Sequence, residues 1–287
     1  VKCSNNFFQG GEVLATLDDI AQELGISKGT VSKALNGAKD VSKKMQQAVL
    51  EKAVELGYSR LNRSTAAPRL AVFILNMEYS KPEDFGYDIV VGFRQAAEPA
   101  GFQVEIIPLT LQLQQEIRYD EYMMRENYCG GLFLGLSLLD PWITEFGTCR
   151  TPTVLYDNHV SGNPKVTSIG VDITESIALA IRHLRSLGHT KIGYLSSALE
   201  AYVYQQRYLA FQQVMTKLGL PADDSVMGNA FHVNVCLSRH LPRLLKNGCT
   251  AILCSHDILA HSVLFYCNEL GLRVPEDISI LGYDDIP

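Results

Sequence analysis

Apolar side chains near the N-terminal end of the chain recur with helical spacing. Between residues 17 and 24, four of them lie three or four positions apart, as on one helix face: Leu17, Ile20, Ala21 and Leu24. Thr16 stands at the N-cap position, and Asp19 three residues later completes the pattern of a capping box. Gly25 follows, where a left-handed residue commonly ends a helix. The pattern therefore predicts a helix over 17–24.

Two more helices are predicted directly after the first. The second covers 28–36, between Ser27 as its cap and Gly37 at its end, and the third follows Ser42 and ends at Gly57. Three short helices with a tight turn between the first two predict a helix-turn-helix unit.

From residue 70 the pattern changes to apolar runs that alternate with helical periods. The first group of predicted strands covers 70–75, 102–109, 130–136 and 151–158, with helices over 88–100, 112–127 and 141–146 between them. The second group of strands covers 166–172, 191–197, 225–231, 251–255 and 278–284, with helices over 173–187, 205–218, 235–246 and 259–270. Alternating strands and helices imply parallel sheets with right-handed crossovers.

These elements predict an N-terminal all-α helix-turn-helix headpiece and an α/β core of two doubly wound parallel-sheet lobes. We expect a disordered tail over 1–13, the helix-turn-helix unit over 14–58, a basic linker over 59–69, a first lobe over 70–167 and a second lobe over 168–287. Ligands of such sheets bind at the carboxyl ends of the strands.

Charge is unevenly divided between these parts. The chain has 287 residues and a net charge of −6, yet residues 1–68 carry nine Lys and Arg against seven Asp and Glu. A basic end on an acidic body suggests that the helical unit faces nucleic acid. A helix in the major groove presents its N-terminal side chains to base edges. The outward positions of the second helix are Lys28, Gly29, Thr30, Ser32, Lys33 and Asn36.

The cysteines and the apolar runs point to a reducing compartment. The seven cysteines form no C-x-x-C, and most of them sit in apolar runs, so we expect buried free thiols rather than a zinc site. No apolar stretch is long enough to span a bilayer, and residues 1–13 lack the apolar run of a signal peptide. We therefore expect a cytoplasmic protein.

Four motifs, in order along the chain, resemble the lactose/galactose repressor family of bacterial transcription factors. They are TLDDIAQELGISKGTVSKALNG at 16–37, LGHTKIGYL at 187–195, QQRYLAFQQVM at 205–215 and RVPEDISILGYDDIP at 273–287. The resemblance covers the chain from Ala15 onward. It implies a periplasmic-binding-protein-like core in a bacterial cytoplasmic protein that is associated with the nucleoid when it is bound to DNA. Two departures stand out: the linker before the first strand is short for a hinge helix, and the family usually continues past GYDDIP, so we expect the second lobe to be incomplete.

The resemblance assigns roles in DNA binding to seven residues. It places Lys28, Gly29 and Lys33 at base-reading positions. It places Thr16, Thr30, Ser32 and Asn36 where the family contacts phosphate or supports the recognition helix. The competing interpretation of these residues is a solvated helix face with ordinary caps. One unit reads only a few base pairs, so the family's homodimer on a near-palindromic double-stranded operator is expected.

The resemblance also predicts a small-molecule effector, with a carbohydrate as the expected class. It places Asp157, Arg207 and Asp284 in a cleft between the lobes, and His256 stands where the family usually has Asn. Asn76 is a weaker candidate, as are Phe85, Tyr87, Phe231 and His232. The alternatives for these side chains are an N-cap, a surface ion pair, a strand-end turn or core packing.

No catalytic motif and no cluster of metal ligands stands out in the sequence, so we expect no enzyme activity, no metal and no cofactor. The predicted function is a DNA-binding transcriptional repressor whose operator affinity depends on a small ligand bound between the lobes. A solute-binding protein without a DNA role is the alternative, and a sugar-processing α/β enzyme with an unrelated helical appendage is a third possibility. DNA-binding assays separate the first from the other two.

Overall fold

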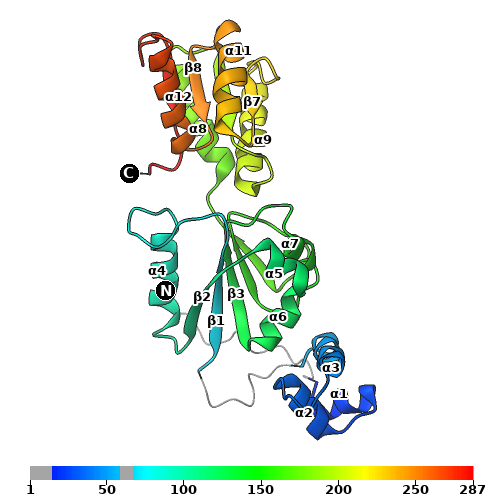
Figure 1. Cartoon of the computed structure of the whole chain (residues 1–287). Coiled ribbons are helices and arrows are strands. Elements are labelled where there is room, and N and C mark those ends of the chain that lie inside the picture. Colours follow the sequence, from blue (N-terminus) through cyan, green and yellow to red (C-terminus); the bar gives the residue numbers. More distant parts are fainter. Residues whose placement is uncertain (1–14, 59–66, 287) are drawn as a thin grey trace.

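The computed structural model describes residues 15–58 and 67–286, and Figure 1 shows three bodies in a row. The predicted tail over 1–13 and most of the predicted linker lie outside the described residues. Arg69, which the sequence assigned to the linker, begins the first strand. The helical headpiece lies at one end of the molecule, the first lobe in the middle and the second lobe at the other end.

The headpiece consists of α1 (Leu17–Leu24), α2 (Lys28–Leu35) and α3 (Lys43–Leu56). The predicted capping box is present, because the Thr16 side chain accepts from the Asp19 amide and the Asp19 carboxylate accepts from the Thr16 amide. Gly25 and Gly57 end α1 and α3 in the left-handed conformation. Ile20, Val31, Val49 and Ala53 are fully buried at the centre of the three helices.

The first lobe is a five-stranded parallel sheet with strand order β2-β1-β3-β4-β5. Its strands are β1 (Arg69–Ile74), β2 (Gln103–Pro108), β3 (Tyr128–Leu134), β4 (Thr153–Tyr156) and β5 (Val166–Ile169). Its helices are α4 (Tyr87–Ala97), α5 (Leu111–Glu116), α6 (Tyr119–Arg125) and α7 (Pro141–Glu145). In Figure 1, α4 lies on one face of the sheet, and α5, α6 and α7 lie on the other.

The second lobe is a four-stranded parallel sheet with strand order β7-β6-β8-β9. Its strands are β6 (Ile192–Ser196), β7 (Met227–Asn229), β8 (Ala251–Cys254) and β9 (Ser279–Leu281). Its helices are α8 (Ile173–Ser186), α9 (Tyr202–Lys217), α10 (Val233–Val235), α11 (Leu241–Lys246) and α12 (Asp257–Glu269), with a π-helical turn over Cys236–His240. The two parallel sheets and the helical headpiece confirm the predicted fold class.

Three predicted elements differ in the structure by more than a small shift of their ends. The strand at 166–169 was expected to open the second lobe, but it pairs with β4 in the first sheet. The helix expected over 112–127 is broken into α5 and α6, because Ile117 is extended and its carbonyl accepts the indole N–H of Trp142 at 2.9 Å. The helix expected over 235–246 is interrupted by the π-helical turn before α11.

The lobes are connected by the chain between β5 and α8, and their loops also meet beside it. The Leu138 amide donates to the Glu200 carbonyl at 2.7 Å, and Ser137 and Ala201 form an isolated bridge.

Six cysteines are described and all are free thiols; Cys149, Cys236, Cys249, Cys254 and Cys267 are buried, and Cys129 is half-buried. Burial raises the pKa of the Cys149 and Cys249 thiols to about 11. The prediction of buried free thiols is therefore confirmed for five of the six described cysteines.

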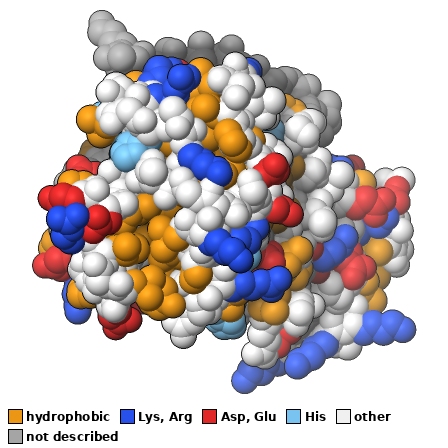
Figure 2. All heavy atoms as spheres, turned by 90° about the horizontal axis from the view of Figure 1, so that it is seen from above, with side chains coloured by type: hydrophobic (Ala, Val, Ile, Leu, Met, Phe, Trp, Pro, Cys, Tyr) orange, Lys and Arg blue, Asp and Glu red, His pale blue; other side chains and the backbone are white. Residues whose placement is uncertain are grey.

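Figure 2 looks onto the second-lobe end of the molecule. Charged side chains of both signs are scattered over this view, and hydrophobic side chains gather in one continuous area. The exposed apolar side chains of this lobe include Ile258 and Phe265 of α12, which are 62% and 69% exposed. Such exposed apolar residues are typical of surfaces that contact another protein. Within the described residues, none of the helices combines the length and the apolar character that crossing a membrane would need.

Candidate nucleic-acid interface and interlobe pocket

The second headpiece helix presents a polar stripe to the solvent. Gly29, Lys33 and Asn36 are exposed and follow the spacing i, i+4, i+7, which aligns them along one side of α2. Lys28 is also exposed, at the first position of the helix. Gly29 has open space around it, since an added Cβ would meet only Ser27 Oγ at 3.6 Å. This side of the helix is free to approach a flat or grooved partner.

Both lysines of α2 pair with acidic side chains of the headpiece. Lys28 Nζ lies 2.6 Å from Asp18 Oδ2, and Lys33 Nζ lies 2.5 Å from Asp40 Oδ2. The hydrogen bond from Lys33 lowers the pKa of Asp40. All four side chains are more than half exposed, and such surface pairs contribute only about 0–1 kcal/mol. A phosphate or a base edge can therefore replace the carboxylates at little cost.

Three of the other predicted interface residues, Thr16, Thr30 and Asn36, take part in helix caps. Thr16 caps α1, and Thr30 bonds Ser27 through its amide at 3.1 Å and its hydroxyl at 2.9 Å. Asn36 is the C-cap residue of α2, and Ser32 is half-buried. These residues hold the shape of the headpiece beside the exposed lysines. The helix predicted over 28–36 ends one residue earlier than expected.

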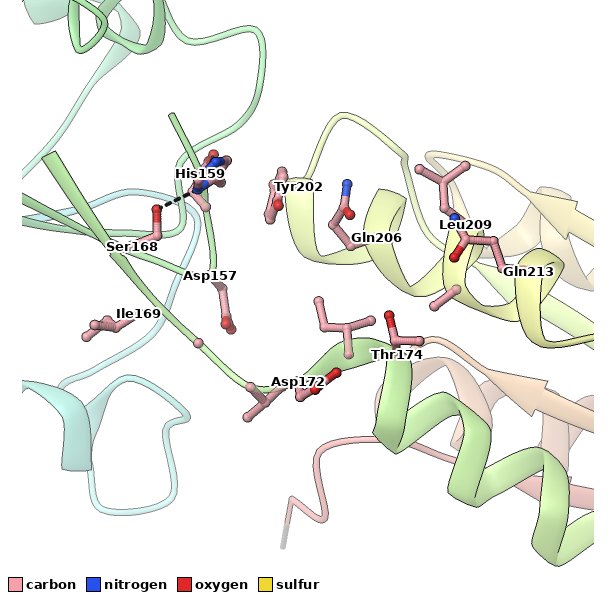
Figure 3. Close-up of a pocket in the computed structure, with 15 residues that line it drawn as sticks. Asp157, His159, Ser168, Ile169, Asp172, Thr174, Tyr202, Gln206, Leu209 and Gln213 are labelled. Carbon is pink, nitrogen blue, oxygen red and sulfur yellow. Dashed lines mark hydrogen bonds between the residues drawn. The ribbon is translucent and has the colours of Figure 1, made fainter. Parts of the chain in front are cut away.

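A pocket with a volume of about 350 Å³ lies between the two lobes, beside the connection from β5 to α8 (Figure 3). Its wall is contributed by the end of β4, by the β5–α8 connection and by α9. The lining residues are Asp157, Asn158, His159, Ser168, Ile169, Gly170, Val171, Asp172, Ile173, Thr174, Tyr202, Gln206, Leu209, Ala210 and Gln213.

Helix α9 supplies one polar wall of this pocket. Tyr202, Gln206, Leu209 and Gln213 follow the spacing i, i+4, i+7, i+11, which places them on one stripe of the helix. Sequence reasoning missed this wall because it began the helix at Gln205 and searched it for charged groups. An aromatic ring beside two amides offers a flat apolar surface together with hydrogen-bond donors and acceptors.

The opposite wall comes from the first lobe and carries Asp157 and His159. Asp157 directly follows β4 and has a positive φ of 49°. Burial raises the pKa of Asp157, while the charge of Arg207 lowers it and that of Asp284 raises it further. His159 Nδ1 lies 3.1 Å from Ser168 Oγ, and the His159 ring centroid lies 6.4 Å from that of Tyr202 across the pocket.

Arg207 and Asp284 form a partly buried ion pair whose charges act on Asp157. Arg207 is 4% exposed, and its Nη2 lies 2.6 Å from Asp284 Oδ1. Its Nη1 also donates to the Ser255 carbonyl and to Asp284 Oδ2, and its guanidinium lies 3.6 Å from the centroid of the Tyr283 ring. The fork of Arg207 is thus largely occupied within the second lobe, and Arg207 and Asp284 lie outside the set of pocket-lining residues.

His256 caps the last helix of the second lobe. Its Nδ1 accepts from the Leu259 amide at 3.2 Å, so the neutral ring carries its proton on Nε2, which lies 2.7 Å from Ser197 Oγ. The ring also lies 5.2 Å from that of Tyr204, measured between centroids. Burial lowers the pKa of His256. The structure thus brings His256 close to the charges of Arg207 and Asp284, which both act on its pKa.

The other sequence candidates lie away from the pocket. Asn76 is an exposed residue after β1 with a positive φ of 53°. Neither it nor any of the weaker candidates, which are Phe85, Tyr87, Phe231 and His232, lines the pocket. Among the described residues there is no group of three or more His, Cys, Asp or Glu arranged to hold a metal ion.

Comparison with known proteins gives two family matches and relatives that match most of the chain. The model for bacterial regulatory proteins of the lacI family matches residues 16–60, and the model for periplasmic binding protein-like domains matches residues 181–287. The HTH-type transcriptional regulator MalR of Streptomyces coelicolor is 29% identical over 281 residues, which cover 94% of this chain and 80% of MalR. The HTH-type transcriptional repressor CytR of Escherichia coli is 26% identical, over 96% of this chain and 81% of CytR.

A solved structure matches the whole architecture. The lac repressor dimer bound to operator and the anti-inducer ONPF has a TM-score of 0.60 and 23% identity, and the match covers 95% of this chain and 83% of that one. At this level of identity the likeness concerns the fold, in which a helical headpiece precedes two α/β lobes.

Proposed function

Because this chain belongs to the lacI family of bacterial regulatory proteins, it is a DNA-binding transcriptional regulator, and we propose that a small ligand bound between its lobes controls its affinity for an operator. The observation that carries the proposal is the combination of an exposed, lysine-bearing helix α2 with a pocket whose walls come from two separate lobes. We place its action in the bacterial cytoplasm, where the chromosome lies. The curated relatives are transcriptional regulators, and we infer that this chain binds its ligand without converting it.

In this proposal α2 enters the major groove of double-stranded DNA. Lys28 and Lys33 exchange their carboxylate partners for phosphates or for guanine O6 and N7. Gly29 allows the helix to approach closely, and Asn36 lies on the same stripe. Thr16 and Thr30 hold the headpiece in shape through helix caps, and the half-buried Ser32 lies beside them near the phosphates.

The lining of the pocket favours a neutral ligand rich in hydroxyl groups. Asp157 and Asp172 contribute carboxylates, and the described lining residues include neither Lys nor Arg, so a phosphorylated or carboxylated ligand would be repelled. Tyr202, Gln206 and Gln213 supply a ring face and amides that suit a sugar or a nucleoside. We propose a carbohydrate, with Asp157 as its acceptor from the first lobe. Arg207 and Asp284 are within electrostatic reach of Asp157, and His256 is within reach of both.

We propose that the working form is a homodimer on a near-palindromic operator. Ile258, His261 and Phe265 lie on one exposed stripe of α12, at the spacing i, i+3, i+7. A second copy of the chain covers this stripe in the proposal. Two headpieces then read two half-sites, as symmetric regulators do.

The test of DNA binding starts from a random pool of duplexes. The sequence retained by the protein is labelled, and its affinity is measured by fluorescence anisotropy over a range of salt concentrations. Lys28→Ala and Lys33→Ala should each weaken binding about tenfold or more, as loss of one base or phosphate contact does. Lys81→Ala, which changes an exposed lysine of the first lobe, is the matched control. Absence of any sequence preference at low salt contradicts the proposal and leaves only a ligand-binding protein.

The test of ligand binding uses thermal shift with neutral monosaccharides, disaccharides and nucleosides. A ligand that binds only the folded state raises the melting temperature. Tyr202→Ala and Gln206→Ala should abolish the rise, whereas Gln205→Ala, which changes the neighbouring glutamine outside the pocket, should preserve it. The ligand found in this way is then added to the operator complex. An unchanged operator affinity at saturating ligand contradicts the proposed coupling between the sites.

A further inference from the structure

We propose that helix α6 of the first lobe is a docking surface for the headpiece of the same chain, and that Glu121 positions the recognition helix α2 through its bond to Gln47 of α3. The inference rests on the proposed DNA-binding function and adds a residue that sets its geometry. In Figure 1 the headpiece lies beside α6, with α3 facing the lobe.

The bond between Gln47 and Glu121 lies at the centre of this contact. Gln47 Nε2 donates to Glu121 Oε2 at 2.8 Å, across 74 residues of chain. The Glu121 side chain is only 4% exposed, and Arg118, the N-cap residue of α6, donates to its other oxygen. A carboxylate buried at a junction is costly unless both oxygens are bonded. Arg118 of the lobe therefore bonds one oxygen of Glu121, and Gln47 of the headpiece bonds the other.

Apolar and close-range contacts extend the docking surface. Met124, one turn after Glu121, packs against the apolar core of the headpiece, to which Tyr58 also belongs. The guanidinium of Arg150 approaches Gly57 so closely that a Cβ at Gly57 would lie 2.7 Å from Nη1. The backbone amide of Arg150 is itself bonded to Asp120 of α6 at 2.8 Å. The headpiece core thus continues into the lobe.

Charges support the same arrangement. The pKa of Arg118 is raised first by its bond to Glu121 and also by the charges of Glu51 and Glu145. Glu51 belongs to α3 of the headpiece, one turn after Gln47, and Glu145 belongs to α7 of the lobe. Arg118 therefore attracts acidic groups of both the headpiece and the first lobe, which favours the docked arrangement of the two.

The docking surface leaves the DNA-facing side of the headpiece uncovered. Contact with the lobe runs through α3 and the residues at its end, whereas Lys28, Gly29, Lys33 and Asn36 of α2 remain exposed. Docking therefore fixes the orientation of α2 without blocking it. In a homodimer, two headpieces fixed in this way can match only one distance between half-sites, because a rigid pair tolerates little change in the span.

The test first breaks the bond between Gln47 and Glu121 in the full chain and then re-forms it with donor and acceptor exchanged. Gln47→Glu places a second carboxylate against Glu121, and Gln22→Glu adds the same charge at an exposed position of α1 as the matched control. Binding is measured on the selected operator with its central spacer lengthened or shortened by one and two base pairs. The unmodified chain and Gln22→Glu should discriminate between the best and the worst spacer by about tenfold or more, while Gln47→Glu should reduce this ratio to about threefold or less.

The pair Gln47→Glu with Glu121→Gln re-forms the bond in the opposite direction and should restore the discrimination. A purely structural defect would lower the affinity for all spacers equally and would not be rescued. If Gln47→Glu keeps the spacer preference of Gln22→Glu, the proposal is wrong.

A second measurement is independent of DNA. In calorimetry without DNA, the docked headpiece should melt together with the first lobe, and Gln47→Glu should separate a headpiece transition at lower temperature. If the headpiece of the unmodified chain already melts separately, α6 does not hold it, and the inference fails even where operator binding is intact. If the chain binds no operator but the transitions separate as described, docking stands and the DNA-binding proposal fails.

Discussion

Asp284→Asn isolates the contribution of the ion pair with Arg207 to the stability of the second lobe. Asp284 has a positive φ of 101°, and asparagine tolerates positive φ as well as aspartate does, so the change removes charge without adding backbone strain. Asp285 beside it also has a positive φ, of 55°, and is exposed. Asp285→Asn is therefore a matched control that should change the unfolding free energy by less than about 0.5 kcal/mol.

The expected loss for Asp284→Asn follows from the burial of its partner. Removing one member of a buried ion pair costs about 3–5 kcal/mol, because the other charge is left uncompensated. Arg207 is 4% exposed, but the Asp284 side chain is 19% exposed, and asparagine keeps one acceptor oxygen for the guanidinium. Water and this oxygen offset part of the loss, so we expect about 2–3 kcal/mol. Adding Arg207→Met should recover part of it, since the unpaired charge is then absent.

Urea unfolding followed by two probes measures this effect. Far-ultraviolet circular dichroism reports both lobes, whereas Trp142, the single tryptophan, is buried in the first lobe and reports that lobe by fluorescence. Asp284→Asn should lower the second-lobe midpoint by about 1–2 M urea, given typical m-values. A midpoint equal to that of Asp285→Asn, or a double variant with Arg207→Met that is less stable than Asp284→Asn alone, would refute the reasoning.

Three further predictions concern other parts of the chain. Burial lowers the pKa of His256 from 6.5, so the unfolded chain takes up the proton first as the pH falls, and the unfolding free energy should decrease from pH 7.5 to 5.5. His256→Asn keeps an acceptor for the helix cap and should flatten this dependence in urea titrations. Gly135→Ala should destabilise the first lobe by more than about 3 kcal/mol in urea unfolding, because its φ is 74° and the new Cβ would lie 1.7 Å from the Leu75 carbonyl oxygen. Asp18→Asn should strengthen DNA binding at low salt by about two- to fivefold in anisotropy titrations, since it releases Lys28 and removes a charge that repels phosphate, and an unchanged affinity would contradict this assignment.

The headpiece and the two sheets could be predicted because their determinants are local. Thr16 with Asp19, Gly25 and Gly57 are caps that act within a few residues of their own position. The break between α5 and α6 was missed because its cause, the indole of Trp142, lies 25 residues from Ile117 in sequence. No period in the sequence reports such a bond.

The candidate sites were predicted less completely, for the same reason. The sequence predicted Arg207, His256 and Asp284 as effector-binding residues. In the structure Arg207 and Asp284 form an ion pair across 77 residues, and His256 caps a helix. Their contact with a ligand stays a prediction. The polar stripe that includes Tyr202 and Gln206 was missed, because it becomes a pocket wall only when the first lobe lies opposite α9, and the sequence of α9 does not show that placement.

The buried cysteines make the two lobes separately observable. With a pKa of about 11, Cys149 in the first lobe and Cys249 in the second are ionised to only about one part in a thousand at pH 8. Alkylating reagents attack the thiolate, so each cysteine is shielded until its own surroundings open. The alkylation rate of each cysteine therefore reports how often its own lobe opens. Mass spectrometry separates the two rates and would show which lobe a bound ligand stabilises.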